Sequence, residues 1–116
     1  MTDSVPVDQK FRINRSVKIF TPSHHVFETK AIEISLIELS IVSPKPMKQD
    51  VVLNVEFSLP IPGKGFFDVH VKCKVIYNTL IPAEAKYHVG LQFLDIDPQH
   101  SNIVKEYIEY RIAVSD

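Results

Sequence analysis

The chain has 116 residues, of which 45% are hydrophobic and 23% charged, and its formal net charge at pH 7 is -1. This size and composition fit one globular domain rather than a disordered tail. Because the chain has no basic surplus, we do not expect DNA or RNA as a partner. The single cysteine, Cys73, excludes an internal disulfide and a cysteine zinc cluster, which favours a reducing, cytoplasmic setting.

The amino terminus is polar and lacks the apolar stretch of a secretory signal. No run approaches the roughly 18 apolar residues that would predict a membrane span. We therefore expect a cytoplasmic protein with no membrane span. Residues 1–9 are expected to form a mobile arm because they are polar, and residues 10–113 to form the domain.

Alternation of apolar and polar side chains predicts the strands. In chain order they are expected near 15–20, 32–36, 38–43, 51–59, 69–77 and 87–93. The clearest alternation places one apolar set on a buried face: Val69, Val71, Cys73, Val75 and Tyr77. The prolines and glycines of 59–65 predict a hairpin connection. Five or six such strands favour an all-β barrel or sandwich.

The last segment changes its period. Apolar residues recur at helical spacing after Asp97-Pro98, namely at Ile103, Val104, Tyr107, Ile108 and Ile112. Asp97 is the expected N-cap and Pro98 the first helical residue. An amphipathic helix from about residue 98 is expected to cover an open end or face of the barrel.

Three segments together resemble the PilZ domain family. Residues 33–46 begin Glu33-Ile34-Ser35-Leu36-Ile37-Glu38, similar to the family's second signature, (Asp/Asn)-x-Ser-x-x-Gly followed by a strand and a proline-containing turn. Lys10-Phe11-Arg12 is similar to the end of the first signature, Arg-x-x-x-Arg. The segment 87–95 and the helix are similar to the family's last strand and closing helix. The resemblance implies a six-stranded antiparallel β-barrel closed by an amphipathic α-helix, with no catalysis.

The resemblance also implies a ligand, the bacterial second messenger cyclic-di-GMP. In binding members the arginines hold its phosphates, while the acid or amide and the serine hydrogen-bond its edges, which assigns these roles to Arg12, Glu33 and Ser35. Strand alternation separately places Glu33 and Ser35 on the polar outer side, opposite Ile32 and Ile34. Lys10 and Arg15 lie near enough in the chain to add phosphate contacts.

Two positions disrupt the family's motifs. Asp8 stands where the first arginine is expected, and Glu38 stands at the glycine position. Together with Arg12 and Glu33 these residues carry a net charge of -2, which opposes a ligand with two negative phosphates. No other cofactor is expected. His24 and His25 point to opposite faces if they lie on a strand, so they make a poor metal pair.

Two functions remain open. The first is a non-enzymatic signalling adaptor for motility or biofilm control, which docks onto an unidentified protein and has weak or lost nucleotide affinity. The second is a true cyclic-di-GMP receptor that binds through Arg12, Ser35 and nearby basic residues. Both have the same fold and differ at one site.

Overall fold

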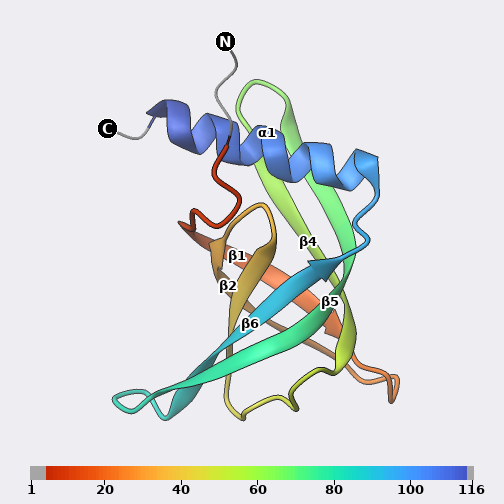
Figure 1. The fold of residues 1–116 in the computed structure, drawn as a ribbon, viewed down its shortest axis with the longest axis vertical. Coiled ribbons are helices and arrows are strands. Elements are labelled where there is room, and N and C mark those ends of the chain that lie inside the picture. The colour runs from red at the N-terminus through yellow and green to blue at the C-terminus, as the bar shows by residue number, and fades with distance from the viewer. Residues whose placement is uncertain (1–4, 115–116) are drawn as a thin grey trace.

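The computed structural model describes residues 5–114, whose strands close into a barrel with one helix across it (Figure 1). Its elements are β1 (Phe11–Phe20), β2 (Val26–Ile34), β3 (Glu38–Ser43), β4 (Val52–Ile61), β5 (Gly65–Ile81), β6 (Lys86–Leu94) and α1 (Pro98–Val114). The barrel order is β1-β2-β3-β6-β5-β4, with every pair antiparallel. The predicted six-stranded antiparallel barrel with a carboxyl-terminal helix is confirmed.

The expected arm, residues 1–9, is only partly described. Residues 1–4 lie outside the described residues. Val5 packs against the core, and Pro6 to Gln9 form a turn in which the Gln9 N–H donates to the Pro6 carbonyl at 3.4 Å. The mobility of this arm and the domain limits 10–113 stay predictions.

The core fills the barrel because successive residues of each strand point to opposite faces. The largest fully buried side chains come from all six strands and the helix: Ile19, Ile34, Leu39, Ile41, Leu53, Leu59, Leu91, Ile108, Val17, Val55, Val69 and Val75. Each such side chain stabilises the fold by about 1.5–3 kcal/mol through removal from water. Cys73 is also fully buried, as its position in the alternation predicts, and burial raises the pKa of its thiol to about 12.

Two irregularities in the pairing change which side chains face the core. One lies between Val75 and Tyr77, where the β5 register against β6 shifts by one residue. An extra residue on one strand reverses the faces beyond it. The prediction that Tyr77 shares the buried face of Val75 is therefore wrong, and its ring lies on the outside of the barrel, over Gly90.

The second irregularity lies in β2, between Ala31 and Glu33. Ala31 and Ile34 are both fully buried although they are three residues apart. Ile32 is half-exposed and lines an outer cavity together with Glu33. The prediction that Ile32 faces inward opposite Glu33 is wrong, because the irregularity interrupts the alternation.

The hairpin and the helix follow the local signals in the sequence. Gly63 and Gly65 adopt φ values of 80° and 102° in the β4–β5 turn, a region that favours glycine. The Asp97 carboxylate accepts from the His100 N–H at 2.9 Å and so caps α1, which begins at Pro98. The helix buries Val104, Tyr107 and Ile108 and lies across β4 and β5, as Figure 1 shows.

Candidate functional site

Two of the predicted site residues meet on the outer face of the barrel. Arg12 of β1 and Glu33 of β2 are direct partners in the strand register. With Ile13, Ile32 and His88 they line a cavity of about 260 Å³. The Arg12 side chain is exposed and Glu33 is half-buried. His88 reaches this cavity from β6, a placement that depends on strand order and that the sequence did not signal.

Ser35 lies elsewhere, in the turn between β2 and β3. Its side chain is 0% exposed, and its hydroxyl accepts hydrogen bonds from the N–H groups of Ile37 at 3.2 Å and Glu38 at 3.1 Å. Its own N–H donates to the Glu38 carbonyl at 2.9 Å. The prediction that Ser35 lies on the polar outer side is wrong, since β2 ends at Ile34 and the hydroxyl serves as a turn cap.

Glu38 begins β3 and stands in a polar cluster, which we call the Glu38 cluster (Lys10, Glu38, Ser40 and Tyr77). The Lys10 ammonium lies 3.3 Å from the Glu38 carboxylate, whose side chain is only 14% exposed. The Tyr77 hydroxyl donates to the same carboxylate at 3.4 Å and lies 3.0 Å from the Ser40 hydroxyl. Lys10 also lies over the Tyr77 ring, 5.4 Å from its centroid. Strands β3 and β5 thus hold Lys10, the residue before β1, in place.

The charge state of Lys10 follows from these contacts. Partial burial acts to lower the pKa of Lys10, but the Tyr77 hydroxyl and the Glu38 carboxylate outweigh it and raise the pKa above 10.5. Lys10 is therefore a cation at neutral pH. Its charge is directed at an acid of its own chain rather than at an open surface.

Gly90 makes room for the Glu38 cluster. It lies opposite both Tyr77 and Ser40 in the sheet, and the Tyr77 ring lies directly over it. A Cβ atom at Gly90 would come within 2.1 Å of the Tyr77 Cε2 atom. A glycine inside a strand often marks such a close approach, so Gly90 was the signal that could have found Tyr77.

Arg15 points away from Arg12. Its guanidinium donates from Nε to the Ser58 carbonyl at 3.1 Å and from Nη2 to the Ser58 hydroxyl at 2.8 Å. The same group stacks at 5.1 Å on the ring of Phe66, which is 67% exposed. A register irregularity in β1 lies between Arg12 and Arg15. The structure therefore does not bring Arg15 together with the other predicted site residues.

The helix is hydrogen-bonded to β1 at the end of the strand that carries Arg12. Arg111 Nη1 donates to the Arg12 carbonyl at 2.8 Å and to the Tyr107 hydroxyl at 2.7 Å. Its guanidinium lies over the rings of Phe11 and Tyr107. Arg111 was not a predicted site residue, because only the tertiary structure brings the last turn of α1 to Arg12.

Asp8 lies exposed in the turn before β1.

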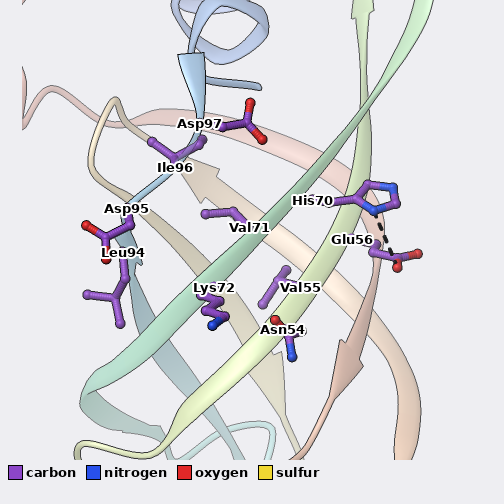
Figure 2. A pocket seen from close by; sticks show the side chains of 10 residues that line it. All are labelled: Asn54, Val55, Glu56, His70, Val71, Lys72, Leu94, Asp95, Ile96 and Asp97. Carbon is purple, nitrogen blue, oxygen red and sulfur yellow. Dashed lines mark ion pairs between the residues drawn. The ribbon is translucent and has the colours of Figure 1, made fainter. Parts of the chain in front are cut away.

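A second cavity, of about 410 Å³, lies between β4, β5 and the segment that joins β6 to α1 (Figure 2). Figure 2 shows His70 and Glu56 pointing toward each other, with 3.6 Å between His70 Nδ1 and the carboxylate. The His70 ring stacks on His100 with 5.6 Å between centroids. None of the predicted site residues lines this cavity. Within residues 5–114, no cluster of three or more His, Cys, Asp and Glu side chains could hold a metal ion.

The fold has known counterparts, although no protein-family model and no curated protein matches the chain by sequence. The Bacillus subtilis inhibitor of motility (MotI/DgrA) superposes with a TM-score of 0.77 at 14% identity, over 92% of this chain and 51% of its own. The Escherichia coli YcgR PilZ domain with c-di-GMP gives 0.62 at 14% identity, over 90% and 92%. The MrkH–c-di-GMP complex of K. pneumonia gives 0.68 at 14% identity, over 96% and 54%.

The chain has the PilZ fold. It spans about half of the MotI/DgrA and MrkH chains and nearly all of the YcgR PilZ domain. At these identities the likeness establishes the fold, and the candidate site rests on the residues themselves. α1, the helix among the described residues, is not long and apolar enough to cross a membrane.

Within the PilZ fold the predicted site residues lie in four separate places. Arg12 and Glu33 share the outer cavity, and Lys10 and Glu38 form an ion pair beside Tyr77. Ser35 caps a buried turn, and Arg15 is bonded to Ser58 on the far side of β1. Arg12 is the one guanidinium that lines the outer cavity in the described part of the chain.

Proposed function

We propose that this PilZ-fold chain is a non-enzymatic signalling adaptor of a cyclic-di-GMP network, acting in the cytoplasm by docking onto another protein. Its own affinity for the nucleotide is weak or lost. MotI/DgrA is described as an inhibitor of motility, and YcgR and MrkH have been solved with c-di-GMP. These descriptions support a role in c-di-GMP signalling and motility control, because the chain shares their fold.

The observation that carries the proposal is the Glu38 cluster. Glu38 takes the position at which the PilZ signature has glycine, and Lys10 and Tyr77 both contact its carboxylate. An ion pair formed within the chain takes up the cation that would otherwise be available to a phosphate. A phosphate brought near Glu38 and Glu33 would also be repelled, by about 1–3 kcal/mol for each acid at close range.

The size of the outer cavity supports the same conclusion. Its volume of about 260 Å³ is below the roughly 300–1,000 Å³ typical of sites for drug-sized ligands. A cyclic dinucleotide carries two bases and two phosphates, so it would need more room and more cations than Arg12 and its neighbours supply. Ser35 is already satisfied by two backbone donors.

A second candidate, a true receptor, keeps one observation in its favour. Arg12 and Glu33 lie side by side in the register and line one cavity. A planar guanidinium there could hold a phosphate through two hydrogen bonds. In this alternative the arm before β1 would move, release Lys10 from Glu38, and close over the nucleotide.

Titration calorimetry with cyclic-di-GMP separates the two candidates. The adaptor proposal predicts no saturable heat at ligand concentrations up to about 1 mM, which corresponds to a binding free energy weaker than about -4 kcal/mol. Binding at micromolar or lower concentration, abolished in Arg12→Ala and kept in the control Lys105→Ala on the exposed side of α1, would establish the receptor instead.

A further inference from the structure

One edge of β2 is paired along only part of its length. Its register with β1 runs from Val26 to Ile34, whereas its register with β3 begins at Ala31. Beyond Ile41, β3 continues along β6 as far as Ser43. Among residues 5–114, no strand pairs with residues 26–30 on the side away from β1. An edge of this kind presents backbone N–H and C=O groups to which another chain can pair.

A groove of about 430 Å³ lies beside this edge. One wall is Phe27 to Thr29 of β2, and the other is the segment after β3, residues 43–47. The lining includes four apolar side chains: Phe27, Pro44, Pro46 and Met47. An apolar groove next to a free strand edge fits an extended segment, because strand addition combines backbone pairing with pockets for alternate side chains.

The far wall of the groove is held in a fixed position. The Asn78 side chain of β5 accepts from the Met47 N–H at 2.8 Å and donates to the Met47 carbonyl at 2.8 Å. The Thr29 hydroxyl donates to the Val42 carbonyl and ties the near wall to β3. Two proline residues further restrict the segment. A preformed groove loses little conformational entropy when it binds.

The charges beside the groove are mainly basic. Lys45 lines it and is exposed, and Lys30 is exposed at the end of the unpaired stretch. The one acid in the lining, Glu28, lies opposite Lys18 in the β1–β2 register. This arrangement favours an occupant with acidic side chains. A second copy of the chain would bring the same lysines against these, so it is the less favoured occupant.

We propose that residues 26–30 accept an extended, acidic segment of a partner protein as an added strand, with an apolar side chain in the groove. Period-2 alternation then turns every second side chain of the partner toward the face of β2 that carries Phe27 and the others toward the face that carries Lys30. This inference rests on the proposed adaptor role and names the surface through which the adaptor acts. The test below uses no nucleotide, so its failure is distinct from a failure of the calorimetric test.

The probe is a peptide selected from a display library of random peptides of about twelve residues, with the full chain as the target. We expect the selected peptides to alternate apolar and acidic residues. In amide NMR spectra of the full chain, the tightest peptide should shift residues 26–30 and 43–47 and slow amide exchange in 26–30. An N-methylated analogue that lacks alternate N–H donors should bind at least about tenfold more weakly, since each lost hydrogen bond weakens binding a few-fold.

Charge variants test the basic side of the groove. Lys45→Glu should weaken the peptide about threefold to tenfold and reduce the salt dependence of binding, while Lys105→Glu on α1 should leave both unchanged. The proposal is overturned if no selected peptide binds below about 100 µM, or if the shifts map to other residues. It is also overturned if the N-methylated analogue binds equally well, or if raising the protein concentration alone shifts residues 26–30, which would identify a second copy as the occupant.

Discussion

The Glu38 cluster and the free edge of β2 involve neighbouring strands, but they differ in whether their polar groups have partners within the chain. In the cluster, Lys10 and Tyr77 contact the Glu38 carboxylate within the chain, and the Ser40 hydroxyl contacts that of Tyr77. At the edge, the backbone of residues 26–30 has a strand partner on one side only, among the described residues. We propose that the carboxylate of Glu38, at the glycine position of the signature, replaces a ligand contact with an internal ion pair. On this proposal, the surface that a partner would use is the backbone edge of the same barrel.

Restoring the PilZ signature should have the largest effect. The double change Asp8→Arg with Glu38→Gly removes two acids, adds one guanidinium and releases Lys10. We expect cyclic-di-GMP affinity to rise at least about 100-fold, because each close charge contributes about 1–3 kcal/mol. Calorimetry measures the change. The double change Asp68→Arg with Glu84→Gly alters the total charge equally at exposed sites away from the motifs, and an equal gain there would contradict the explanation.

Substitution of Gly90 should have the next largest effect. In Gly90→Ala the new Cβ would collide with the Tyr77 ring. Displacing the ring should lower the free energy of unfolding by about 1–3 kcal/mol, as measured by urea denaturation. Introducing Gly90→Ala into a Tyr77→Ala background should cost clearly less. Equal losses in both backgrounds would mean that the contact with Tyr77 is not the cause.

Hydrogen exchange compares the β2 edge with a strand that is paired on both sides. Amides in residues 26–30 that point away from β1 should exchange at least about tenfold faster than amides in the middle of β4. The amides of the same stretch that bond to β1 serve as an internal control and should exchange slowly. Uniform protection throughout residues 26–30 would show that the edge already has a partner.

The Lys10–Glu38 ion pair should contribute the least. Lys10 is partly exposed and screened by solvent, so Lys10→Met should lower stability by no more than about 1 kcal/mol near neutral pH. Because the folded-state pKa of Lys10 is raised, the contribution is fully present below about pH 10 and is lost as the pH rises through the folded-state pKa. Thermal unfolding of Lys10→Met and of the control Lys105→Met across this range measures it. A loss that does not change with pH would exclude the ion pair as its source.

The sequence alone determined the strands, the hairpin turn and the helix, while the choice of a barrel over a sandwich came from the family resemblance. Three local signals in the sequence were confirmed. The alternation of apolar residues matches the buried set, the glycines match the β4–β5 turn, and the Asp-Pro helix start matches the cap at Asp97. Local patterns succeed here because burial of one strand face or one helix stripe depends on spacing along the chain. The PilZ resemblance of short motifs also led to the fold that the structure shows.

The tertiary structure decided which side chains meet. Irregularities in β2 and β5 turned Ile32 and Tyr77 outward, Ser35 was drawn into a buried turn, and Arg15 was directed to Ser58. The partners of Lys10, Arg12 and Asn78 lie between 28 and 99 residues away in the sequence at their contacts with Glu38, Arg111 and Met47. A one-residue shift in strand register leaves the alternation pattern on either side intact but reverses the faces. For this reason the sequence could name candidate residues but could not say which of them share a site.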